Sequence, residues 1–183
     1  MRRSEKRNKQ AISTVTFQFQ KGKIMAAYIK FDGIDGECQD KDHKAWSDLL
    51  SFNQAMHKAG GGQTSTARRR GDVVLEDIVV RKLVDKSSPK LAEAVCNGKV
   101  FPKVEIHVSA TYTDSGRTTY YAYELKNVMV SSYQVEGNSS DDTPTDSFSL
   151  NFEEIKCTYT ECDNAGKKKG NVEYNWKVSE GEK

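Results

Sequence analysis

The sequence predicts a mainly β protein, in which the sheet curls into a small barrel beside one short helix. Three observations predict this fold. Segments with alternating apolar and polar residues recur along most of the chain. One segment alone carries the start and stop signals of a helix. Two strands change their apolar face midway, as strands of a sharply curved sheet do. The 183 residues are enough for one domain with a proper core.

The first strands are predicted at Tyr28–Asp32 and Ser47–His57, separated by the turn residues Gly33 and Gly36. The second of these strands has one largely apolar face and one small, polar face. We expect the apolar face to point to the core; it holds Leu50, Phe52, Gln54 and Met56. The other face holds Leu49, Ser51, Asn53 and Ala55.

A long loop and a doubly apolar strand come next. Lys58–Gly71 is rich in Gly, Ser, Thr and Arg, and loops of this length within a domain are usually functional or disordered. Asp72–Val84 reads as one long strand with apolar residues on both faces. Such a strand is buried on both sides, either within its own domain or against a partner.

The helix is predicted between Ser88 and Gly98. Ser88 suits the N-cap, Pro89 the first helical position and Gly98 the residue after the end. The helix has two to three turns and a short apolar face at Leu91 and Val95, so its stability must come from packing on the sheet.

The remaining segments read as strands, and two of them change face. Val104–Tyr112 alternates without interruption and a turn at Asp114–Gly116 follows. In Thr118–Val135 the apolar positions change phase between Leu125 and Val128. In Asp146–Thr160 they change from Phe148, Leu150 and Phe152 to Ile155, Cys157 and Tyr159. Each change requires a bulge or a sharp bend. The last strand is predicted at Val172–Val178.

The charge of the chain is unevenly placed. Residues 1–24 hold seven basic side chains and one acidic one, so they carry +6 and the rest carries −4. They are not a secretory signal peptide, because Ile12–Gln20 alternates like a strand instead of forming an apolar run. They are either a genuine basic β-arm, or an addition from an upstream start codon or expression vector before a natural start at Met25. Nowhere is there an apolar run long enough to insert into a membrane.

Catalytic and metal-binding patterns are missing from the sequence. His43, His57 and His107 have no metal-ligand spacing, and no phosphate-binding loop or nucleophile elbow occurs. We expect the carboxylate pair Glu153-Glu154, at the second bend, to be exposed. We therefore expect no catalytic residue, no metal and no cofactor.

The four cysteines are expected to be reduced thiols, because they have no CxxC spacing; they are Cys38, Cys96, Cys157 and Cys162. A pairing of Cys157 with Cys162 stays open.

Several segments, in order, resemble the Hcp family, the tube proteins of bacterial type VI secretion. They are Tyr28–Lys30, Ile34–Cys38 with Asp40–His43, Asp85–Leu91 after Lys82, Val128–Tyr133, Phe148–Phe152 and Tyr174–Trp176. The likeness spans residues 25–183, so the expected division is an extension at 1–24 and an Hcp-like domain at 25–183. Cys38 stands where serine is common in the family. The chain ends just after its last strand, so it resembles the plain tube subunit without a toxin domain.

The resemblance implies a barrel of two packed antiparallel sheets with a helix at its side, assembling into a homohexameric ring. Rings would stack into a tube within a contractile sheath, under a spike of the VgrG type. Small effector proteins would travel in the lumen. The protein would assemble in the bacterial cytoplasm and leave by the type VI system without a signal peptide. Independently, the doubly apolar strand favours self-association, since a closed ring seals such a surface.

The resemblance also implies two functional regions. Ser51, Asn53 and Ala55 would face the lumen and contact effectors, or simply be solvated. Arg68, Arg69 and Arg70 would lie in a loop that reaches the next ring, or be merely solvated as well. Both assignments are predictions.

Two other classes of function compete with the tube. A nucleic-acid-binding barrel could use the basic segment 1–24 and Arg68–Arg70, although the aromatic residues mostly occupy inward positions and give no stacking platform. A small hydrolase would need a nucleophile and a base, which the sequence does not pair. We therefore expect no nucleic-acid partner.

Overall fold

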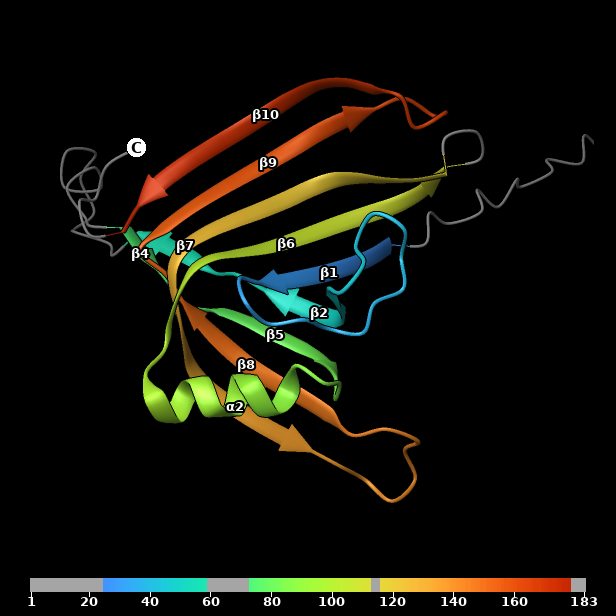
Figure 1. Ribbon diagram of the computed structural model, residues 1–183. Helices are drawn as coiled ribbons and strands as arrows, with labels where there is room; N and C mark the ends of the chain where they lie inside the picture. The colour runs from blue at the N-terminus through green and yellow to red at the C-terminus, as the bar shows by residue number, and fades with distance from the viewer. Residues whose placement is uncertain (1–24, 59–72, 113–115, 179–183) are drawn as a thin grey trace, which may run out of the picture.

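An antiparallel sheet closes on itself in the computed structural model, which describes residues 25–58, 73–112 and 116–178 (Figure 1). The strand order is β10-β9-β7-β6-β1-β2-β5-β8, and β8 also pairs with β7, which closes a barrel of six strands. The strands of this sheet are β1 (Met25–Phe31), β2 (Ser47–Asn53), β5 (Ile78–Leu83), β6 (Val100–Tyr112), β7 (Gly116–Glu136), β8 (Thr145–Asn151), β9 (Glu154–Cys162) and β10 (Lys168–Lys177). The predicted mainly β barrel with a short helix is confirmed.

The long strand β7 joins the barrel to the strands that extend beyond it. Its first half pairs with β9 over Tyr121–Lys126, and its second half pairs with β8 from Met129 onward. Between the halves, Asn127 has a φ of 50°. This left-handed residue shifts the phase of the strand, so that Leu125 and Val128 both point inward. The predicted change of face is confirmed.

The second change of face also occurs, although its continuation differs from the prediction. The predicted strand is interrupted at Phe152 and Glu153, between β8 and β9. After this interruption Ile155 and Cys157 are buried. Tyr159 was expected to continue this inward series, yet it is 46% exposed. Tyr159 still pairs with Tyr121 of β7, but its ring packs edge-on against Tyr120 instead of entering the core.

The helix α2 (Ser88–Asn97) packs on the barrel through Leu91 and Ala94, which are buried. Its C-cap Gly98 has a φ of 62°, a conformation that glycine adopts without strain. The predicted helix is confirmed, but its N-cap is Ser87 and not Ser88. Ser88 is buried because its hydroxyl belongs to an ionic cluster described below.

The predicted direction of two apolar side chains in the second strand is wrong. Leu50 and Met56 were expected in the core, yet they are 53% and 50% exposed. The pairing of β2 with β5 shifts between Leu49 and Ser51, and this irregularity puts both Leu49 and Phe52 against the core. β2 then ends at Asn53, so Met56 belongs to a different strand.

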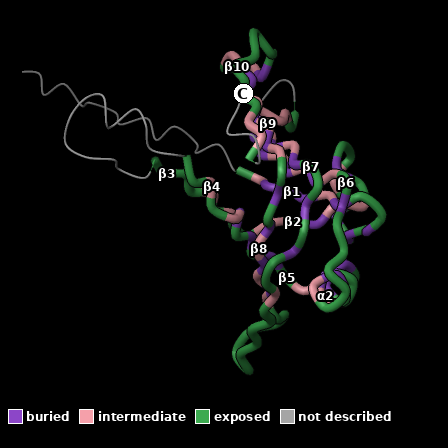
Figure 2. Tube along the Cα trace, turned by 90° about the vertical axis from the view of Figure 1, so that its left-hand side faces the viewer, coloured by how far each residue is buried: buried purple, intermediate pink, exposed green. Residues whose placement is uncertain are grey.

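The predicted strand Asp72–Val84 is also not continuous. It is divided at Glu76 and Asp77 into β4 (Val73–Leu75) and β5. β4 pairs with β3 (Met56–Lys58) in a separate two-stranded sheet, which we call the arm. Figure 2 shows the arm standing away from the barrel. Ile78 and Val80 enter the core, whereas Val73, Val74 and Val79 remain exposed in the single chain.

Candidate assembly and cargo surfaces

A polar surface covers the outside of four neighbouring barrel strands, β2, β5, β8 and β7. Ser51 and Asn53 of β2 lie opposite Arg81 and Val79 of β5. The next strands continue the two rows, with Ser147 and Ser149 on β8 and with Ser132 and Gln134 on β7. We call this surface the polar face; its residues are Ser51, Asn53, Val79, Arg81, Ser132, Gln134, Ser147 and Ser149.

The polar face is nearly neutral and carries short hydrogen-bonding side chains. The Ser132 hydroxyl donates to the Ser149 hydroxyl at 2.9 Å. Arg81 donates to Thr145 at 3.2 Å and forms an ion pair with Glu136 at 3.4 Å. Of the predicted lumen residues, the structure brings Ser51 and Asn53 together on this face. Ala55 is exposed beyond the end of β2, where its carbonyl accepts a hydrogen bond from the Glu76 backbone at 3.0 Å.

The predicted stacking residues Arg68, Arg69 and Arg70 lie outside the described residues. The structure does describe the arm, and its strands β3 and β4 flank residues 59–72 in the sequence. The arm exposes Met56, Val73 and Val74.

A buried ionic cluster holds α2 to the barrel. Lys82 of β5 and Asp146 of β8 are paired across the sheet, and both are 0% exposed. The Lys82 ammonium lies 3.0 Å from Asp146 and 2.8 Å from Asp85. The Ser88 hydroxyl donates to Asp146 at 2.5 Å. Burial would raise the pKa of Asp85, but hydrogen bonds from Lys82, Ser47 and Ser87 hold it below its ordinary value.

The sequence interpretation missed this cluster, although the signal was present. Lys82 is in phase with the inward residues Ile78 and Val80, and Asp146 is in phase with Phe148 and Leu150. A charged residue in an inward position of each of two strands is a sign that the two charges meet.

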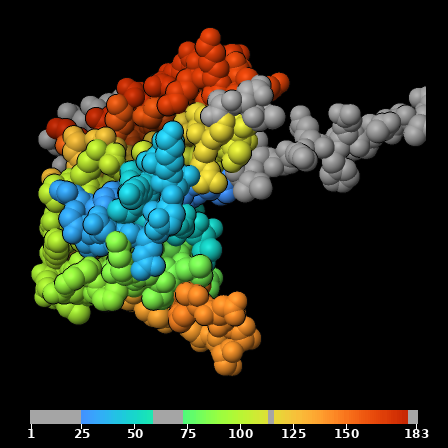
Figure 3. Space-filling view, turned by 45° about the vertical axis from the view of Figure 1, so that its right-hand side comes forward, coloured from blue at the N-terminus to red at the C-terminus, as the bar shows by residue number. Residues whose placement is uncertain are grey.

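A second polar cluster fastens the connection between β1 and β2, which covers the outside of the barrel in Figure 3. His43 is stacked on Tyr28 with ring centroids 4.1 Å apart. Its Nδ1 lies 2.9 Å from the Asp40 carboxylate, and its Nε2 lies 3.0 Å from Nδ1 of His107. Because a carboxylate only accepts, His43 donates from Nδ1 to Asp40, and in its neutral form it then accepts at Nε2 from Nδ1 of His107. Arg117 donates to Asp40 at 2.7 Å and also to the Tyr28 hydroxyl.

Burial, and secondarily the neighbouring His43, lower the pKa of His107 to about 4, so this histidine is neutral at pH 7. Burial would raise the pKa of Asp40, but hydrogen bonds from His43 and the Asp42 backbone, with the charge of Arg117, hold it below its ordinary value.

The remaining candidate groups have structural contacts. Glu153 accepts a hydrogen bond from Asn127 at 2.6 Å, and Glu154 pairs with Lys126 at 2.8 Å, so both carboxylates brace the bend of β7. Within residues 25–58, 73–112 and 116–178, no group of three or more potential ligands is placed to hold a metal ion. All four cysteines are free thiols, so Cys157 and Cys162 are not paired.

Together these features define a small β-barrel subunit with a neutral polar face and exposed apolar side chains. Comparison with known proteins identifies its family. The model of the type VI secretion system effector Hcp matches residues 28–159. Protein hcp1 of Pseudomonas aeruginosa is 31% identical over 152 residues, which are 82% of this chain and 93% of that protein.

Solved structures agree with this result. The structure of a type six secretion system protein matches with a TM-score of 0.77 and 28% identity, over 87% of this chain and 99% of that one. Hcp1 from Salmonella typhimurium shares the fold, with a TM-score of 0.67 and 20% identity over 85% of this chain and 96% of that one.

The chain belongs to the Hcp family and is a type VI secretion protein of the tube and effector kind. The comparisons give no support to the nucleic-acid-binding alternative. Residues 1–24, on which that alternative depended, lie outside the described residues.

Proposed function

We propose that six copies of this chain form a closed ring, that the rings stack into a tube, and that the polar face lines the lumen and holds small effector proteins. The observation that carries the proposal is the polar face itself. It presents hydroxyl and amide groups beside the exposed Val79, with Arg81 balanced by Glu136. Such a surface can hold a folded cargo through hydrogen bonds without selecting for its charge.

The proposed partners follow from the family. They are further copies of the chain, a VgrG-type spike at the end of the tube, the contractile sheath around it, and effectors within it. The protein would assemble in the bacterial cytoplasm and be secreted without a signal peptide. No helix in the described part of the chain is long and apolar enough to cross a membrane.

The ring is tested by light scattering after size exclusion and by negative-stain microscopy. We expect particles of six times 20.5 kDa that appear as rings. A well-folded single subunit at high concentration, with no rings in the micrographs, would contradict the proposal.

The role of the polar face is tested with Asn53→Arg. We expect rings to persist and co-purification of an effector to be lost, because a long cation would project from the face into the space that the effector occupies. Asn171→Arg is the matched control, since Asn171 is exposed on β10 outside the polar face. Equal loss of the effector in both variants would reject the assignment.

The role of Arg68, Arg69 and Arg70 is tested by changing all three to Glu. We expect single rings without tubes, because repeated ion pairs with a neighbouring ring would become repulsive. Each exposed pair contributes only about 0–1 kcal/mol, so the effect depends on repetition around the ring. Reversal of Lys86, Lys90 and Lys99, which are exposed near α2, is the control. Normal tubes in the arginine variant would refute the assignment.

A further inference from the structure

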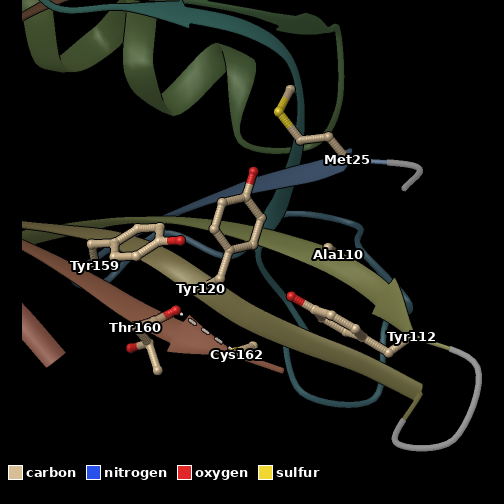
Figure 4. Close-up of a pocket in the computed structure, with 7 residues that line it drawn as sticks. All are labelled: Met25, Ala110, Tyr112, Tyr120, Tyr159, Thr160 and Cys162. Atoms are coloured by element: carbon tan, nitrogen blue, oxygen red, sulfur yellow. Dashed lines mark hydrogen bonds between the residues drawn. The ribbon is translucent and has the colours of Figure 1, made fainter. Parts of the chain in front are cut away.

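A cavity lined by tyrosines opens at the end of the barrel where β1 begins and where β6 and β9 end. Its volume is 210 Å³. Figure 4 shows Tyr120 between Tyr159 and Tyr112, with Met25 beside the same space. The rings of Tyr120 and Tyr159 meet edge to face at 6.4 Å. We call this cavity the tyrosine pocket; it is lined by Met25, Ala110, Tyr112, Tyr120, Tyr159, Thr160 and Cys162.

The wall of the tyrosine pocket is only partly covered within the described part of the chain. Met25 is 57% exposed and Tyr159 is 46% exposed, whereas Ala110 and Tyr112 are buried. Large apolar side chains at the mouth of a cavity are stabilised when another apolar group removes them from water. A segment that starts at this end of the barrel is well placed to do so.

The chain itself enters the barrel at the wall of this pocket. Met25 is the first residue of β1, and its partner on β6 is Ala110. Strand β6 continues for two residues beyond that partner, to Tyr112. If the antiparallel register continues, Lys23 lies opposite Tyr112. The 24 residues that precede Met25 therefore begin their path directly beside the tyrosine pocket.

The segment before Met25 carries a side chain that suits the pocket. Val15, Phe17 and Phe19 alternate with polar residues and share one face of an extended chain. Gly22 lies between Phe19 and Met25, and glycine permits the tight turn that returns the chain over the end of the barrel. Six residues of extended chain span at most about 20 Å, so the cavity beside Met25 is within reach of Phe19.

We propose that the segment 1–24 folds back at Gly22 and places the ring of Phe19 in the tyrosine pocket of its own chain. The segment is then a working part of the folded domain and not an addition in front of it. This inference goes beyond the proposed function and does not depend on it, because the pocket and its occupant belong to one chain.

The size and the chemistry of the pocket match a phenylalanine ring. A cavity of about 150 Å³ accommodates benzene, so a volume of 210 Å³ has room for the ring of Phe19. Aromatic rings favour edge-to-face contacts, which Tyr120 and Tyr159 already make with each other. The sulfur of Met25 adds a favourable contact with an aromatic ring. The short connection to Met25 also keeps the effective concentration of Phe19 at the pocket high.

The first test measures whether the pocket is covered. Cys162 lines the pocket and is partly exposed, and in a full chain with the exposed Cys96 changed to Ser the two other thiols are buried. We expect Phe19→Ala to make Cys162 react about tenfold faster with N-ethylmaleimide, because the docked ring shields the thiol. Gln18→Ala changes the opposite face of the segment and should leave the rate as it was. Equal rates in the two variants would overturn the inference.

The second test determines where the segment docks. In the same Cys96→Ser chain, Phe19→Cys puts a thiol at the docking position. After oxidation with diamide, we expect a disulfide between positions 19 and 162 in the band of 20.5 kDa on a non-reducing gel. Trypsin then releases residues 10–21 joined to residues 157–167, which mass spectrometry identifies. The added change Cys162→Ser should abolish the joined peptide.

Gln18→Cys in the Cys96→Ser chain is the matched control, since neighbouring residues of an extended segment point to opposite faces. We expect it to yield about tenfold less of the joined peptide than Phe19→Cys. Equal yields would contradict docking through Phe19. A joined peptide found in bands at multiples of 20.5 kDa would place the segment in a second copy, and this also overturns the inference.

These outcomes are read separately from the proposed function. Rings without the link between positions 19 and 162 would reject the docked segment and leave the proposed function standing. The link in a chain that forms no rings would reject the proposed function and leave the docked segment standing.

Discussion

The two polar clusters of this barrel fasten different connections, and they differ in the charge that they bury. The cluster at α2 buries a full ammonium with carboxylates, Lys82 with Asp146 and Asp85. The cluster under the β1–β2 connection joins the ionised Asp40, which pairs with Arg117, to His43 and the neutral His107.

Because the buried charges differ, the two connections respond differently to mutation and to pH. A fully buried ion pair stays intact as long as both partners stay charged, and removing one partner leaves the other unpaired. A neutral buried histidine is favourable only while it stays neutral, so acid acts on it first. The first cluster is therefore sensitive to mutation, and the second is sensitive to pH.

The largest effect is expected from Lys82→Met. The substitution keeps the length of the side chain but leaves Asp146 buried without its cation. We expect the free energy of unfolding to fall by about 3–5 kcal/mol. Urea or thermal unfolding followed by circular dichroism measures it.

The double variant Lys82→Met with Asp146→Leu is the control for that result. It removes the fully buried Lys82–Asp146 pair and leaves Asp85 with its hydrogen bonds from Ser47 and Ser87, so we expect it to recover much of the lost stability. A double variant as unstable as the single one would show that the pair itself, and not the stranded charge, stabilises the fold.

A smaller effect is expected from acid on the second cluster. The pKa of His107 is about 4 in the fold and 6.5 ordinarily, so between these values the unfolded chain binds more protons. The contribution of His107 to the free energy of unfolding is fully present above pH 6.5, falls as the pH approaches 4 and is constant below that. The groups that act on His107 are His43, Glu105 and Lys103 nearby and Lys168 on β10.

At lower pH the carboxyl groups of both clusters titrate. Asp85 and Asp40 have pKa values lowered from 3.8, so their contribution is present above pH 3.8 and is lost only at lower pH. His107→Gln should therefore flatten the unfolding free energy between pH 6.5 and 4 and leave the decline below 3.8. Unfolding curves at half-unit pH steps measure both ranges. An unchanged slope between pH 6.5 and 4 would contradict the role of His107.

The smallest effect is expected from Arg117→Gln. Its ion pair with Asp40 is partly open to solvent, with Arg117 38% exposed. We expect a loss of about 1 kcal/mol or less, which shrinks further at 0.5 M salt because screening already weakens the pair. A loss as large as that of Lys82→Met would show that the outer pair is as important as the buried one.

Much of the barrel could be predicted because alternation reports which residues face inward. The phase change between Leu125 and Val128 predicted the bend that Asn127 makes. The irregularity after Leu49 had no such signal, because Leu49 and Leu50 are equally apolar and only the pairing with β5 selects between them. The division of Asp72–Val84 was missed for a similar reason. Its apolar pattern is continuous, and only the pairing of β4 with β3 directs Val73–Leu75 away from the barrel.

By itself the sequence determined the class of the fold and the positions of most strands and the helix, since local alternation and turn residues act over a few neighbours. The family followed from the segments that resemble it. Only the tertiary structure decided that Lys82 meets Asp146 and that His43 meets His107. These pairs join residues far apart in the chain, and their meeting depends on how the sheet closes. Alternation fixes the face that a side chain takes, whereas strand register fixes the side chain that it meets.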